Sequence, residues 1–204
     1  MPSRTFLNLP IDKQNTLLEA ARNEFTRVLL SEASINRIIK EANIPRGSFY
    51  MYFEDKEDIY YYLLEKNRSQ FIEKTRQIFV DNNGDIITCF TLLYDYLMSF
   101  CMTEDNKNFF KNVLMNINFK NEYPIFSSHN PEVMKKNLME LVSLIDKTNL
   151  NIHDNEDIFD LLNMIMMLTI HSLVKTVKHP ELLTQNRKKY INQLRMLKHG
   201  VYTK

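Results

Sequence analysis

Residues 34–53 read SINRIIKEANIPRGSFYMYF, and this stretch carries the main structural signal of the chain. Apolar side chains recur at helical spacing after Ser34, a residue type that often caps a helix N-terminus. Asn43 tolerates the left-handed backbone of a tight turn, and Pro45 suits the first turn of a new helix. The pattern predicts two short helices joined by a tight turn, over residues 34–41 and 45–51.

The second of these helices has an unusual composition. Gly47 lies inside it, although glycine costs about 1 kcal/mol relative to alanine in a helix interior. Phe49 and Phe53 are spaced to enter a core, whereas Tyr50 and Tyr52 lie elsewhere around the helix. A helix that only packs in a core would use leucine and alanine, so this composition needs a further explanation.

A longer helix is predicted from Ile11, ahead of the two short ones, and the three together form the helix-turn-helix pattern. The helix at 45–51 is then the recognition helix. Gly47 would let its backbone approach DNA closely, and its hydroxyl side chains can donate to phosphates. Local positive charge comes from Arg37, Lys40, Arg46 and Lys56. A further helix begins after Asp55, and its N-terminal amides can also hold a phosphate.

The composition favours an all-α fold. The chain has 204 residues, 44% of them apolar, but only 3 glycines and 6 prolines. Few turn-forming residues in a long chain favour long helices with few connections. The net charge is +1, so a nucleic-acid site must depend on local basic residues.

The two cysteines are expected to be reduced and buried. Cys89 and Cys101 lie on one predicted helix, about 18 Å apart along its axis, which is too far for a disulfide. No run of 18 apolar residues and no signal-peptide core occur in the sequence. These features predict a soluble cytoplasmic protein with no membrane partner.

Several features after residue 54 predict a second helical domain. A long helix should run from Asp55 to about Val80, where Asn82-Asn83-Gly84 interrupts the chain. Further helices are predicted at 85–102, 104–118, 130–147, 156–177 and 183–198. We therefore expect a DNA-binding domain at 1–54 and an effector-binding and dimerisation domain at 55–204.

The residue types and their spacing over residues 10–65 resemble the DNA-binding domain of tetracycline-repressor (TetR) type regulators. The matching runs are Leu17–Phe25, Ala33–Ile44 and Gly47–Ile59. The sequence departs from the family in the loop after the first helix and at Asn43, where glycines are common. The resemblance implies an all-α homodimer whose variable C-terminal domain binds a small effector. The resemblance implies DNA contacts at Ser34, Pro45, Gly47, Ser48, Tyr50, Met51, Tyr52 and Lys56. We add Arg37 and Arg46 to the predicted DNA contacts because of their positive charge.

The segment 156–177 is predicted to be a helix with apolar residues on two faces. Met164, Met167 and His171 lie along one face, and Ile170 and Leu173 lie along another. Such a helix must be covered on several sides. One side can be the protomer's own core and the other a partner protomer, while the alternative is a central helix of a monomer. The helix at 183–198 is a second candidate for the dimer surface.

Methionine and aromatic residues gather on the helices after residue 85, as in apolar ligand pockets, although ordinary core packing is the alternative. His171 is either a core residue or a ligand for a polar effector group or a haem iron. The proposed effector site comprises Phe90, Tyr94, Met98, Phe109, Met167 and His171.

The sequence contains no nucleophile elbow, P-loop, zincin motif or Cys-x-x-Cys pair, so no enzyme, metal site or cofactor is expected. The leading hypothesis is a repressor that a small hydrophobic or aromatic effector releases from a palindromic double-stranded operator. The alternatives are a haem- or metal-sensing regulator on the same fold and a helical ligand-binding protein without DNA recognition.

Overall fold

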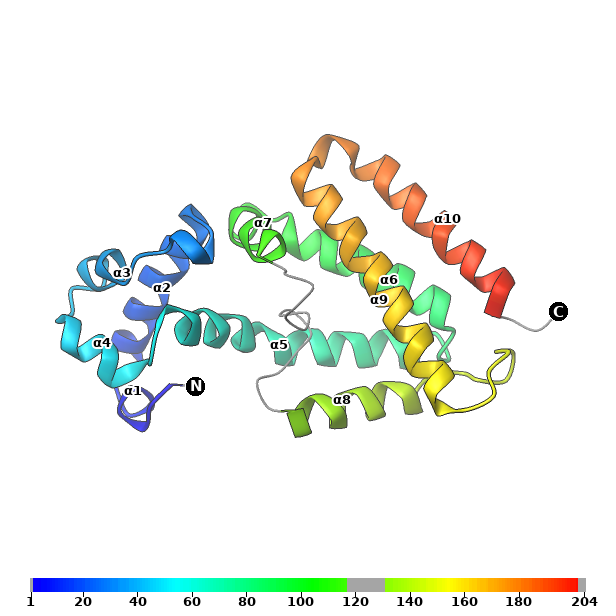
Figure 1. Ribbon diagram of the computed structural model, residues 1–204, viewed down its shortest axis with the longest axis horizontal. Helices are drawn as coiled ribbons and strands as arrows, with labels where there is room; N and C mark the ends of the chain where they lie inside the picture. The colour runs from blue at the N-terminus through cyan, green and yellow to red at the C-terminus, as the bar shows by residue number, and fades with distance from the viewer. Residues whose placement is uncertain (1, 117–130, 202–204) are drawn as a thin grey trace. The chain divides into compact units, whose positions relative to one another are not determined.

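The computed structural model describes residues 2–116 and 131–201, and within them the chain is all-helical (Figure 1). This confirms the predicted fold class. The chain forms two compact units. The first unit comprises residues 1–69 and 104–128, and the second comprises residues 70–103 and 129–204. The ends of two predicted helices, at residues 117–118 and at residue 130, lie outside the described residues.

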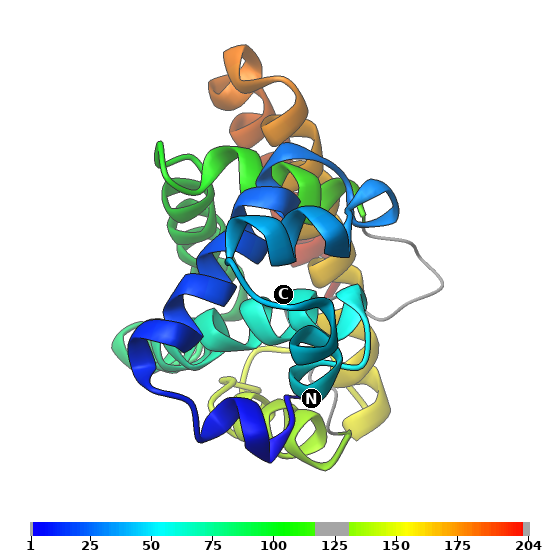
Figure 2. The same ribbon diagram turned by 90° about the vertical axis from the view of Figure 1, so that its left-hand side faces the viewer.

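The first unit contains the helix-turn-helix. Its elements are α1 (Arg4–Leu7), α2 (Ile11–Arg27), the 3-10 turn η1 (Leu30–Glu32), α3 (Ile35–Glu41), α4 (Arg46–Tyr52), the first part of α5 (Lys56–Asp81) and α7 (Lys107–Met115). Figure 2 turns α1–α4 toward the viewer. Phe49 and Phe53 are buried in its core, as predicted, together with Phe25 of α2. Asn43 has a φ of 52°, which confirms the left-handed turn between α3 and α4.

The second unit contains the rest of α5, α6 (Ile86–Cys101), α8 (Pro131–Ser143), α9 (Asn155–Lys178), the 3-10 turn η2 (Pro180–Leu182) and α10 (Leu183–Val201). In this unit α9 packs against both α6 and α10. Both cysteines are buried and free, as predicted from their spacing. Burial raises the pKa of each thiol to about 12, because a thiolate loses its solvation in an apolar core.

The interruption after α5 depends on a glycine. Asn83 and Gly84 both have positive φ, at 51° and 72°. The carbonyl oxygen of Gly84 accepts a hydrogen bond from the Asp146 N–H at 3.1 Å. A side chain at this position would overlap the Leu144 carbonyl oxygen, so the close approach of these two segments requires glycine.

The two apolar faces of α9 have different surroundings. Ile170 and Leu173 are 3% and 1% exposed, so they belong to the core of their own unit. Met164 and Met167 are each 46% exposed. By length and composition alone α9 could cross a membrane, yet its inner face packs as in the core helix of a globular unit.

Candidate nucleic-acid interface

The residues proposed to contact DNA all lie in the first unit, on or next to α3 and α4 and at the start of α5 (Figure 2). Tyr50 and Met51 are 48% and 60% exposed, so α4 presents two large side chains to solvent. Arg37, Pro45, Arg46 and Gly47 are exposed, and Ser34, Ser48, Tyr52 and Lys56 are partly exposed. The structure therefore places these residue types together on one unit, where α4 presents tyrosine and methionine to solvent.

Arg46 links α3 to the exposed face of α4. Its guanidinium donates to Asn36 Oδ1 at 2.6 Å and to the Tyr50 hydroxyl at 3.2 Å. The guanidinium carbon also lies 5.6 Å from the centre of the Tyr50 ring. A guanidinium has five N–H donors, so these contacts orient Arg46 while leaving donors for a phosphate or a guanine.

Packing within the protein does not require glycine at position 47. No atom lies within 4 Å of where its Cβ would be, and its φ is not in the positive range that favours glycine. The free protein would accommodate alanine at this exposed position. The choice of glycine is consistent with a partner that approaches the α4 backbone closely.

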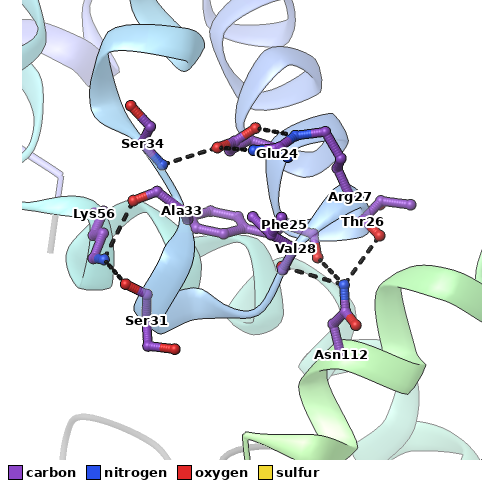
Figure 3. A network of polar contacts seen from close by, with 10 residues as sticks. All are labelled: Glu24, Phe25, Thr26, Arg27, Val28, Ser31, Ala33, Ser34, Lys56 and Asn112. Carbon is purple, nitrogen blue, oxygen red and sulfur yellow. Dashed lines mark hydrogen bonds and ion pairs between the residues drawn. The ribbon is translucent and has the colours of Figure 1, made fainter.

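A buried carboxylate organises the loop between α2 and α3 (Figure 3). Glu24 accepts two hydrogen bonds from Arg27, at 2.9 and 2.8 Å, and one from the Ser34 N–H at 2.9 Å. Burial alone would raise the pKa of this carboxyl, but the bonds from Arg27 and Ser34 hold it below its usual value. Ser34 occupies the predicted N-cap position, but its side chain makes no capping bond.

Lys56 also holds this loop. Its ammonium donates to the Ser31 carbonyl at 2.9 Å and to the Ala33 carbonyl at 3.3 Å (Figure 3). An ammonium has three donors, so one stays available for the phosphate contact predicted from the sequence. Lys56 therefore has a structural role that the sequence did not reveal.

Asn112 of α7 caps the end of α2. Its amide donates to three carbonyls, those of Phe25, Thr26 and Val28, at 2.9, 3.0 and 3.2 Å (Figure 3). The last carbonyls of a helix have no hydrogen-bond donor within that helix, so the Asn112 side chain supplies the missing donor. Sequence analysis missed this role.

A second contact joins α7 and the residues before it to α2. The Arg22 guanidinium donates to the Asp105 carbonyl at 3.0 Å and to Asn106 Oδ1 at 2.7 Å. It also lies 4.4 Å from the centre of the Phe109 ring. Although α5 and α6 separate α7 from the helix-turn-helix in the sequence, α7 therefore belongs to the same compact unit.

The structure places the proposed effector residues on several different helices. Phe90, Tyr94 and Met98 are buried on α6, while Met167 and His171 are exposed on α9. Phe109 belongs to the first unit. Among residues 2–116 and 131–201 no group of three histidine, cysteine, aspartate or glutamate side chains is arranged to hold a metal ion.

A buried hydroxyl network joins α6, α9 and α10 in the second unit. The Tyr94 hydroxyl bonds with Thr176 and Ser172, both at 3.2 Å. The Tyr190 hydroxyl bonds with Thr169 at 2.7 Å, and the two tyrosine rings stack with centres 4.5 Å apart. These bonds satisfy polar groups that would otherwise be costly to bury, and they fix how the three helices pack.

Comparison with known families agrees with this arrangement of helices. Residues 17–63 match the family described as "Bacterial regulatory proteins, tetR family". Residues 85–201, more than half of the chain, match "Tetracyclin repressor-like, C-terminal domain". The chain belongs to the TetR family. It is therefore a helix-turn-helix transcriptional regulator of a family whose members are not enzymes.

Individual relatives of this TetR-family chain are distant. The HTH-type transcriptional regulator SAB2452 of Staphylococcus aureus is 33% identical over 97 residues, which are 48% of this chain and 51% of that protein. The match thus spans about half the length of this curated relative.

Two solved structures have the same fold. SmeT, the repressor of the Stenotrophomonas maltophilia multidrug efflux pump SmeDEF, is 13% identical with a TM-score of 0.62, over 97% of this chain and 93% of SmeT. FadR from Bacillus subtilis in complex with stearoyl-CoA is 16% identical with a TM-score of 0.59, over 88% of this chain and 96% of FadR. At these identities the likeness shows the fold alone.

Proposed function

We propose that the protein is a homodimeric repressor that binds a palindromic operator and that a small hydrophobic or aromatic effector releases it. The DNA-binding part of this proposal is supported by the composition of the exposed face of α4. Tyr50 and Met51 are exposed there, and a hydrogen bond to Asn36 orients Arg46. Gly47 lies on the same helix, where packing does not require glycine.

The DNA interface can be tested without knowing the operator. The unaltered protein is used to enrich duplexes from a random-sequence library, and the enriched duplex becomes the probe. Arg46→Ala should weaken binding to this probe by about 5- to 150-fold, since a good base contact contributes about 1–3 kcal/mol. Lys136→Ala, at an exposed lysine of α8, is the control and should bind as the unaltered protein does. If the Arg46→Ala variant also binds the duplex as tightly as the unaltered protein, α4 is not the recognition helix.

The dimer proposal uses the exposed face of α9. Met164 and Met167 present apolar surface there, next to the partly exposed Leu168. Two-fold dimers are the commonest oligomers, and half-sites about one DNA turn apart would match such symmetry. Sedimentation should show a dimer at micromolar concentration, and Met167→Lys should shift it toward monomer without unfolding it. A monomeric unaltered protein would refute the proposal.

The effector proposal concerns the six residues predicted from the sequence, five of which lie in the second unit. The neighbours SmeT and FadR regulate an efflux pump and bind stearoyl-CoA respectively, so hydrophobic molecules are suitable probes. Phe90, Tyr94 and Met98 are buried, so an effector would select a conformation that is minor in the free protein.

A thermal-shift screen with acyl-CoA thioesters and aromatic cations tests this idea. A true effector should raise the melting temperature and weaken probe binding by about 5- to 150-fold. Phe90→Ala should change the effector affinity, whereas Leu92→Ala, at an exposed position of the same helix, should not. A screen in which no compound stabilises the protein would count against a hydrophobic effector, and a visible absorption band would favour haem.

We also propose a cytoplasmic location and a functional division near residue 54. The division assigns DNA contact to residues 1–54 and sensing to residues 55–204. The compact units divide the chain differently, because the start of α5 and all of α7 belong to the first unit.

A further inference from the structure

The segment before α2 is bonded to the end of α4. The Ser3 N–H donates to the Tyr52 carbonyl at 2.9 Å, and the Ser3 hydroxyl donates to the Met51 carbonyl at 2.6 Å. The last carbonyls of a helix have no partner within it, so Ser3 satisfies groups that α4 leaves open. The same hydroxyl accepts a bond from the Phe6 N–H at 3.2 Å and thereby caps α1.

Packing anchors this segment as well. Phe6 is fully buried, and its ring centre lies 4.7 Å from that of Phe53 and 6.1 Å from that of Tyr52. The ring centre of Tyr62 of α5 lies 5.8 Å from that of Phe6. The end of the recognition helix is therefore held from outside by both hydrogen bonds and aromatic contacts.

Arg4 is exposed next to Ser3. Phe6 is two residues further along, about 200° around a helix, so Arg4 lies on roughly the opposite side of α1 from the buried ring. The chain after α4 carries acidic residues at 54, 55, 57 and 58, which would repel phosphates. Arg4 adds a cation to α1, the helix whose Phe6 and N-cap Ser3 contact the end of α4.

We propose that α1 is part of the DNA-binding surface, with Ser3 as a positioning residue for the end of α4 and Arg4 as a contact to an operator phosphate. This inference rests on the proposed role of α4 as the recognition helix. Ser3 acts through Met51 and Tyr52, both predicted DNA contacts, because it holds the backbone from which their side chains project.

The test of Ser3 compares the enriched duplex with a shuffled duplex of the same length. Ser3→Ala should weaken binding to the enriched duplex about fivefold, which is the effect of one ordinary hydrogen bond. It should change the affinity for the shuffled duplex little. Ser3→Thr keeps the hydroxyl and should restore the affinity. Ser99→Ala, at an exposed serine of α6 whose hydroxyl also donates to a helix carbonyl, is the matched control.

A purely structural role for Ser3 predicts another result. Ser3→Ala would then lower the melting temperature and weaken binding to both duplexes in the same proportion. That outcome, or unchanged binding to the enriched duplex, would overturn the positioning role.

The test of Arg4 is the salt dependence of binding. Arg4→Gln should flatten the slope of log affinity against log salt by about one unit per protomer, as expected for one lost phosphate contact. Lys189→Gln, at an exposed lysine of α10, should leave the slope unchanged. An unchanged slope for Arg4→Gln would remove the phosphate contact from the proposal. If the unaltered protein enriches no duplex at all, the proposed DNA-binding function fails instead.

Discussion

Replacing Gly47 by alanine should separate the stability of the free protein from its affinity for DNA. Gly47 is the second residue of α4, and a Cβ there meets no atom within 4 Å. Glycine is less favourable than alanine in a helix by about 0.5–1 kcal/mol, so the substitution should stabilise the free protein by up to that amount. For a chain of this size the melting temperature should rise by about 1–4 °C.

The same methyl group should weaken DNA binding. If the α4 backbone approaches DNA closely at Gly47, the added atom enters a packed interface, where overpacking costs about 1–3 kcal/mol. This corresponds to binding about 5- to 150-fold weaker, measured by fluorescence anisotropy with the enriched duplex. Scanning calorimetry of the free protein measures the stability in parallel.

Gly200→Ala is the matched control, because a Cβ there also meets no atom within 4 Å and the residue is also helical and exposed. It lies on α10, outside the helix-turn-helix, and should leave the affinity for DNA unchanged. If Gly47→Ala is stabilised but binds the duplex as tightly as the unaltered protein, the close approach to DNA at this residue is refuted.

Three further outcomes can be measured on the free protein. Gly84→Ala should destabilise it by roughly 3 kcal/mol or more in urea unfolding, because the new methyl overlaps the Leu144 carbonyl oxygen and φ is positive. Glu24→Gln should lower stability at neutral pH by about 1–3 kcal/mol. The pKa of Glu24 is lowered by folding, so its contribution is present above the unfolded pKa, and the deficit should shrink as pH falls through the folded pKa. Cys89 and Cys101, with pKa values raised to about 12, should resist iodoacetamide at pH 8 until urea unfolds the protein, and rapid labelling of the native protein would contradict their burial.

The helix-turn-helix was predictable because its signals are local. Caps, turn residues and helical spacing all lie within residues 34–53, and the helices α3 and α4 begin and end within a residue of the predicted positions. The adjoining α1 was not predicted. Four helical residues are too few to show a periodic pattern or to be stable alone. This helix depends on Phe6 and Ser3, which contact residues more than forty positions later.

The position of α7 could not be read from the sequence for a related reason. The three carbonyls that Asn112 caps are 84–87 positions earlier in the chain, and nothing local marks an asparagine as their partner. Sequence order alone placed α7 in the predicted domain at 55–204. The contact of Arg22 with Phe109 lies within the compact unit that also contains the helix-turn-helix.

The two faces of α9 show where periodicity fails even when the helix itself is predicted correctly. Both faces are apolar, so spacing alone cannot say which one is inside. The structure shows that the inner face is the one that carries Thr169 and Thr176, which are fully buried. Thr169 bonds to a tyrosine of α10, and Thr176 bonds to a tyrosine of α6. The methionines, which are flexible and tolerate varied surroundings, lie on the outer face. A charge placed at Ile170 or Leu173 would therefore disrupt the core of one protomer, and only a substitution on the methionine face can test dimerisation separately from folding.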